Sequence, residues 1–279
     1  MPATQIAQNL AFINWTVLTG LALGSYAAVV LLRRLSGATR GYLAFTTMCA
    51  IGFGVLAWAS DGALPGSLGD SPVVVDPTWD DPRGLALGGF WVIAATGLLA
   101  RRFALRAARP IEWVALGSGI ATLAFGSLAW GGGSIGVVAL LLQLVIVSAA
   151  TGGVFAAMIL GHWYLVTPKL PEAPLILLAR SLLAVVILQV ILFWAWVATG
   201  AGPAGGAPFA ALVGPWALFV WLRLIVGLVF PMIVSWASVQ TARSRSMESA
   251  TGLLYINVGS IAAGTILAAG LYFGAGLLV

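Results

Sequence analysis

The chain has 279 residues, of which 61% are hydrophobic and only 8% are charged, and its formal net charge is +5. A soluble domain carries charge on about a quarter of its residues, so this composition excludes an ordinary soluble fold. The arginines stand beside the ends of long apolar runs, which argues against nucleic acid as a partner. The single cysteine, Cys49, excludes an intrachain disulfide and a multi-cysteine metal site.

Eight long apolar runs follow one another along the chain, and runs of this kind match the hydrocarbon thickness of a bilayer. The predicted helices cover residues 10–32, 41–60, 85–100, 110–130, 135–166, 181–199, 210–239 and 248–277. The alternation typical of outer-membrane strands does not dominate anywhere. We therefore predict an all-α, polytopic transmembrane bundle of about eight helices, forming one integral-membrane domain over residues 1–279.

Local features refine three of these helices. The run over 135–166 is longer than the bilayer core at about 1.5 Å per residue, so we expect it to tilt or protrude. The segment 171–180 before the next helix is expected at the membrane interface. Gly227 and Pro231 predict a kink in the seventh helix, because a proline frees the carbonyl one turn earlier.

The distribution of basic residues predicts the orientation. Eleven of the 13 Lys and Arg residues fall in alternate gaps between the runs: Arg33, Arg34, Arg40, Arg101, Arg102, Arg106, Arg109, Lys169, Arg180, Arg243 and Arg245. The opposite gaps hold only Arg83. The positive-inside rule then places both termini on the non-cytoplasmic side. The predominance of Arg over Lys, with abundant Ala and Gly, favours a bacterial source and hence the cytoplasmic (inner) membrane.

The predicted outer loop over residues 61–83 is acidic. It carries five aspartates, one arginine and four prolines: Asp61, Asp70, Asp76, Asp80, Asp81, Arg83, Pro65, Pro72, Pro77 and Pro82. One hypothesis is a docking surface for a basic soluble partner, such as an electron carrier. The other, which we prefer, is a solvated connector stiffened by its prolines.

His162, the only histidine, lies about one turn from the predicted cytoplasmic end of the fifth helix. An imidazole can ligate haem or metal, or hydrogen-bond a quinone carbonyl. A haem with two histidine ligands from this chain is excluded. Tyr164, Tyr255 and Asn257 are candidate members of the same cofactor-binding pocket, with Tyr255 expected at the depth of His162. The competing interpretation is an interfacial histidine among aromatic belt residues.

Arg223 is the strongest anomaly, because a guanidinium within a membrane helix is costly and needs carbonyls, water or an anion nearby. No Asp or Glu lies within any predicted helix core. We therefore assign Arg223 to a substrate site or a subunit interface, with snorkelling to the outer face as the other interpretation. The polar residues Asn14, Gln143, Gln189 and Gln240 are predicted to form hydrogen bonds between helices.

Three classes of function remain open. The first is an integral-membrane subunit of a larger respiratory or photosynthetic electron-transfer complex, contacting quinone or a haem shared with a partner subunit. The second is a transporter of small or anionic solutes, in which Arg223 attracts the anion. The third is an intramembrane lipid-modifying enzyme that uses His162. The sequence has no phosphate loop, nucleophile elbow or cysteine cluster, so we favour a non-catalytic or cofactor-dependent subunit.

Overall fold

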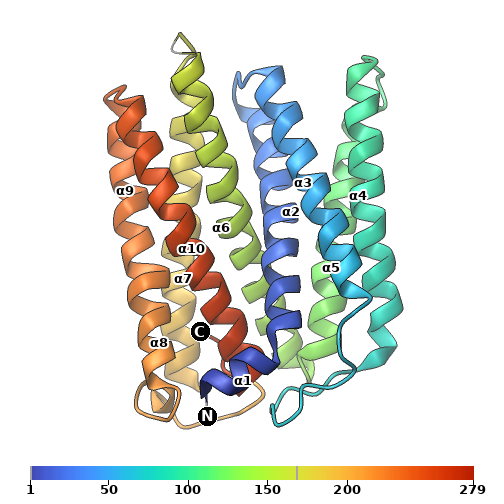
Figure 1. Cartoon of the computed structure of the whole chain (residues 1–279), viewed down its shortest axis with the longest axis vertical. Coiled ribbons are helices and arrows are strands. Elements are labelled where there is room, and N and C mark those ends of the chain that lie inside the picture. Colours follow the sequence, from blue (N-terminus) through green and yellow to red (C-terminus); the bar gives the residue numbers. More distant parts are fainter. Residues whose placement is uncertain (1, 168) are drawn as a thin grey trace.

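The computed structural model describes residues 2–167 and 169–279, and this part of the chain folds into helices and connecting loops without any strand (Figure 1). The α-helices are α1 (Pro2–Gln8), α2 (Leu10–Leu35), α3 (Arg40–Asp61), α4 (Asp80–Arg102), α5 (Ala108–Trp130), α6 (Ser134–Val166), α7 (Ala173–Thr199), α8 (Ala217–Leu224), α9 (Phe230–Arg243) and α10 (Met247–Ala275). Short 3₁₀ turns cover Pro77–Trp79 and Ala210–Leu212. A π-helical segment, Ile225–Val229, joins α8 to α9.

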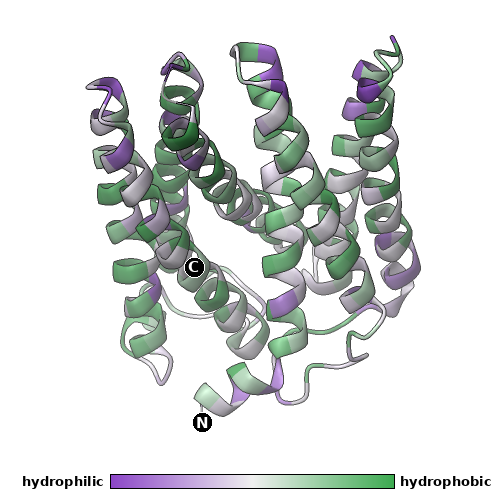
Figure 2. Cartoon of the chain, turned by 45° about the horizontal axis from the view of Figure 1, so that its top comes forward, coloured by the Kyte–Doolittle hydropathy of each residue, from purple (hydrophilic) through white to green (hydrophobic). Residues whose placement is uncertain are grey.

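Within the described residues, eight helical stretches are long and apolar enough to cross a membrane. This confirms the predicted polytopic helical bundle. The chain ends and the loop 62–76 lie at one end of the bundle (Figure 1). We call this the outer end, following the charge bias, and the opposite end the inner end. Figure 2 shows hydrophilic residues gathered at the tips of the helices at the inner end, and mainly hydrophobic residues along their middles.

Helix α2 forms the centre of the bundle and packs against α3, α5, α6 and α10. Its crossing with α6 depends on two glycines. A Cβ atom on Gly24 would lie 1.9 Å from the Ser148 carbonyl oxygen, and one on Gly152 would lie 2.1 Å from the Ser25 nitrogen. No other residue type fits at such a distance, so the two backbones are in direct contact here.

The structure differs from the sequence-based boundaries at two places. Helix α7 begins at Ala173 rather than at 181, because Pro174 occupies the first turn, where its missing N–H costs no hydrogen bond. The short helix α1 was not predicted as a helix. It packs against the outer end of α10, where Gly270 faces Ile6.

The predicted kink in the seventh span takes the form of the π-helical segment. The Phe230 N–H donates to the Ile225 carbonyl five residues back, and Pro231 has no N–H to donate. The Val226 carbonyl therefore lacks both of its usual helical donors. The hydroxyl of Ser260 on α10 donates to this carbonyl and restores the missing bond.

Candidate functional site

The outer end contains a buried ion pair. Arg83 Nε lies 2.7 Å from Asp61 Oδ1, and Arg83 Nη1 lies 2.8 Å from Asp80 Oδ1. The indole N–H of Trp15 donates to the same Asp61 oxygen over 2.6 Å. Arg83 is only 2% exposed and Asp61 8% exposed. A buried carboxylate needs a cation and hydrogen-bond donors of this kind, because burying it without a partner is costly.

Secondary structure brings these residues together. Asp61 is the last residue of α3, and Arg83 lies in the first turn of α4, so the antiparallel packing of these helices places the two side chains side by side. Asp80 and Asp81 also lie in the first turn of α4, where they complement the positive end of its dipole. Trp15 reaches Asp61 from the outer half of α2.

A cavity of about 690 Å³, which we call the outer cavity, adjoins this ion pair. Its lining includes three aromatic side chains and four charged groups: Phe12, Trp58, Trp130, Asp61, Asp80, Asp81 and Arg83. The Arg83 guanidinium lies 4.8 Å from the centre of the Trp130 ring, a cation–π distance. The lining thus combines a few charged groups with aromatic walls, and the cavity is open to the outside.

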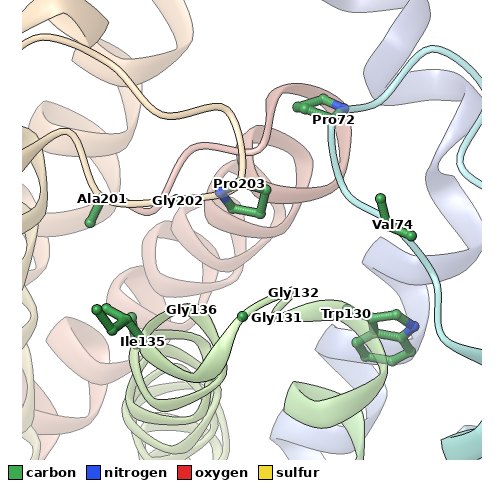
Figure 3. A pocket seen from close by; sticks show the side chains of 12 residues that line it. Pro72, Val74, Trp130, Gly131, Gly132, Ile135, Gly136, Ala201, Gly202 and Pro203 are labelled. Carbon is green, nitrogen blue, oxygen red and sulfur yellow. The ribbon is translucent and has the colours of Figure 1, made fainter.

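A second outer cavity of about 410 Å³ shares the lining residue Trp130 with the first, and Figure 3 shows this second cavity. Its lining is apolar side chains and backbone, and it contains no ionisable group: Pro72, Val74, Trp130, Gly131, Gly132, Gly133, Ile135, Gly136, Ala139, Ala201, Gly202 and Pro203. In Figure 3 the loop carrying Pro72 and Val74 forms one wall, and the indole nitrogen of Trp130 points away from Ile135. The neighbouring Val75 lines the first cavity.

Residues of the loop 62–76 therefore line both cavities. The expectation of a solvated connector is corrected in part, because some of the loop is buried. Leu68 and Val73 are buried in the hydrophobic core, and the Asp76 N–H donates to the Ala129 carbonyl over 2.8 Å. Hydrogen bonds from the Thr78 hydroxyl and N–H lower the pKa of the exposed Asp76 carboxyl. Asp61 is not available to a soluble partner, because it is buried against Arg83.

At the inner end, the structure brings only part of the predicted pocket together. Tyr255 Oη lies 3.4 Å from His162 Nδ1, and both side chains are exposed on the outside of α6 and α10. Tyr164 is buried and its hydroxyl donates to the Pro171 carbonyl. Asn257 is also buried, and its side-chain amide donates to Ser235 Oγ over 2.8 Å. His162 and Tyr255 thus form a pair on the surface. Tyr164 and Asn257 are not part of it, because their side chains form hydrogen bonds with other residues.

Arg223 is 2% exposed and does not snorkel to the outer face. Its Nη1 donates to the Gly227 carbonyl over 3.1 Å, one turn deeper in the span, and Nη2 donates to Gln189 Oε1 over 2.8 Å. Pro231 cannot supply the α-helical hydrogen bond to Gly227, so the guanidinium takes a position left open by the proline. Among the described residues its Nε has no partner.

Sequence reasoning singled out Arg223, whose role in a substrate site or interface stays a prediction, but it missed the Asp61–Arg83 pair. Two signals were present: Asp61 directly follows an apolar run, and Arg83 is the only basic residue in an outer gap. Within the described residues, no group of three or more His, Cys, Asp or Glu side chains is placed to hold a metal ion. No protein-family model, curated protein or solved structure matches the chain.

Proposed function

We propose that the protein is an integral-membrane subunit of an electron-transfer complex, respiratory or photosynthetic, in a bacterial cytoplasmic membrane, and that it binds a quinol in the outer cavity. The outer cavity carries this proposal. Its volume of about 690 Å³ falls within the range of about 300–1,000 Å³ usual for small-molecule sites. Its aromatic walls can flank a planar ring, and its carboxylates can accept the hydroxyl protons of a quinol.

The charge of the lining favours a neutral or cationic ligand over an anion. Three aspartates and one arginine line the cavity, which gives 1 − 3 = −2. Two of the Arg83 nitrogens already donate to Asp61 and Asp80, so the hydrogen-bonding capacity left over is chiefly acceptor capacity. A quinol has two hydroxyl donors and no charge, and Asp81, which is exposed, is a suitable acceptor.

The position of the cavity suits a ligand that dissolves in the bilayer. Trp58 on α3 and Leu85 on α4 belong to the lining and are also exposed on the outside of the bundle. A ring can therefore enter sideways between the outer ends of these helices. The exposed aspartates of the loop, Asp70 and Asp76 among them, would then face a basic soluble electron carrier. The His162–Tyr255 pair, at the opposite end, is a contact for a haem held by a partner subunit.

The test is a titration of the purified protein with a short-chain quinol analogue. Quenching of tryptophan fluorescence measures the binding. We expect saturable binding that Asp81→Asn weakens about tenfold, the effect of one charged hydrogen bond of about 1.4 kcal/mol. Asp70→Asn is the matched control, because Asp70 is exposed on the same loop but does not line the cavity. Equal affinities of both variants and wild type, or no saturable binding, would remove the proposal's support.

Transport of a small anion is the second candidate, and one observation favours it. Arg223 is a buried cation inside a membrane span, it has no carboxylate partner among the described residues, and it adjoins a π-helical segment of the kind that often marks functional positions. Uptake of a panel of anions into proteoliposomes tests it. Uptake that is abolished by Arg223→Met and unaffected by Asp81→Asn would favour transport over quinol binding.

A further inference from the structure

The inner ends of α2, α4 and α5 enclose a buried carboxylate that two arginines share. Glu112 on α5 is 3% exposed. Arg33 Nη1 donates to Glu112 Oε1, while Arg101 Nε and Nη2 donate to Oε1 and Oε2 over 2.5 and 2.7 Å. This carboxylate is the only acidic group at the inner ends of α2 to α5, so its capacity to neutralise charge there is fully used.

Five further arginines lie at the inner ends of α2 to α5 or in the α4–α5 turn, and we call them the basic patch: Arg34, Arg40, Arg102, Arg106 and Arg109. All five are exposed. In the part of the chain that the structure describes, none of them forms an ion pair. Counting Arg33, Arg101 and Glu112 with the patch, this half of the inner end carries 7 − 1 = +6.

The other half of the inner end is much closer to neutral. Around the ends of α6, α7, α9 and α10, four basic residues face two acids, which gives 4 − 2 = +2: Lys169, Arg180, Arg243, Arg245, Glu172 and Glu248. Arg245 and Glu172 lie 3.6 Å apart, so part of this charge is paired. The positive charge is therefore concentrated on one half of the surface rather than spread over it.

The basic patch is combined with exposed apolar side chains. Phe103 and Leu105 in the α4–α5 turn are 70% and 55% exposed, and they stand between arginines of the patch. The Leu105 N–H donates to the Ala100 carbonyl, which fixes the turn at the end of α4. On α5, the Trp113 ring lies 5.3 Å from the Arg34 guanidinium and orients it.

We propose that the basic patch binds the headgroup of an anionic phospholipid of the inner leaflet. A phosphodiester accepts paired hydrogen bonds from guanidinium groups. Its acyl chains would lie along the exposed apolar faces of α4 and α5, next to Leu99 and Trp113. Basic surfaces at the cytoplasmic ends of membrane helices bind such headgroups with roughly additive contributions from each arginine. The source of the phosphate is thus the bilayer that surrounds the helices.

Native mass spectrometry of the delipidated protein, titrated with phosphatidylglycerol or phosphatidylcholine, tests this proposal. The triple variant Arg102→Gln/Arg106→Gln/Arg109→Gln should bind phosphatidylglycerol about 100-fold more weakly than wild type, since each arginine contributes about a factor of five. The matched control is Lys169→Gln/Arg180→Gln/Arg243→Gln, which removes the same charge from the other half and should bind within about threefold of wild type. Thermal unfolding in phosphatidylcholine nanodiscs verifies that both variants remain folded.

Four outcomes would overturn the proposal. Equal losses in the two triple variants would show that net charge, rather than the patch, determines binding. If wild type binds phosphatidylcholine as tightly as phosphatidylglycerol, the patch does not recognise the anionic headgroup. Displacement of the lipid by inorganic phosphate at the same concentration would identify a site for free phosphate. An acidic polypeptide that co-purifies on the patch in place of phospholipid would identify a protein interface.

Discussion

Arg83 and Arg223 are equally buried, at 2% exposure, but the protein stabilises them by different means. Arg83 lies at the outer boundary of the bundle and is paired with two aspartates. Arg223 lies six residues, about 9 Å, beyond the start of α8, and its partners are a carbonyl and a side-chain amide. At the boundary a full counter-charge is available, whereas inside the span the charge is distributed over neutral dipoles. Loss of Arg83 should therefore destabilise the protein much more than loss of Arg223.

The largest expected effect is that of Arg83→Leu. It leaves the Asp61 carboxylate buried without its cation and should lower the free energy of unfolding by about 3–5 kcal/mol. Arg223→Leu should change it by no more than about 1 kcal/mol, because losing two hydrogen bonds is offset by removing a buried charge. Unfolding in mixed micelles with increasing dodecyl sulfate measures both values. The double variant Asp61→Asn/Arg83→Leu should recover part of the loss, and similar losses for the two arginines would contradict the comparison.

The packing around Arg223 can be tested without touching the arginine. A Cβ atom on Gly264 of α10 would lie 2.7 Å from the Gly227 Cα atom and 2.8 Å from Arg223 Nη1. Gly264→Ala should therefore cost about 1–3 kcal/mol in the same unfolding assay, because the helices must separate. Gly259→Ala on the same helix is the matched control, since its Cβ meets nothing within 4 Å. If the two variants unfold alike, the close contact between α10 and the π-helical segment is not present.

The contribution of the Trp15 N–H to the Asp61 pair should be smaller than that of Arg83. Trp15→Phe removes the donor to Asp61 and should lower the free energy of unfolding by about 1.5–3 kcal/mol, in addition to a small loss of packing. Trp91→Phe is a useful control, because the Trp91 indole nitrogen is buried and has no partner among the described residues. Equal losses in both variants would show that the Asp61 carboxylate does not depend on this hydrogen bond.

The smallest expected effect concerns Asp76, which serves as an exposed reference for the buried Asp61. Its pKa is lower in the folded protein than in the unfolded chain because Thr78 donates to the carboxylate. Its stabilisation is thus present above the unfolded pKa and disappears as the pH falls through the folded pKa. Asp76→Asn should remove this weak acid dependence, measured by unfolding between about pH 6 and pH 3. If Asp76→Asn unfolds with the same acid dependence as wild type, the Asp76 carboxylate does not contribute to stability.

Sequence reasoning succeeded where the determinant is local. The length of each apolar run predicts a span, and all eight spans are present as helices, because this effect acts on adjacent residues. The orientation taken from the arginine-rich gaps stays a prediction. Gln189 was predicted to bond between helices, and it does, by accepting from Arg223 on α8. Gln143 instead donates to the Val279 carbonyl in the segment that follows α10. Asn14 and Gln240 are instead exposed.

The parts that were missed depend on how separate helices pack. Asp61 looks like the first residue of a loop until α4 brings Arg83 beside it and α2 brings Trp15. Tyr255 and His162 were expected at the same depth, but their contact depends on the register of α10 against α6, which no local pattern specifies. The start of α7 was misplaced because Pro171 and Pro174 resemble a break, although a proline in the first turn is compatible with a helix.

The course of the loop 62–76 has a mechanical consequence for the two outer cavities. Val74 lines one of them and Val75 lines the other, so a single extended strip of backbone is their common partition. A ligand in one cavity that displaced this segment would therefore also move part of the wall of the other cavity.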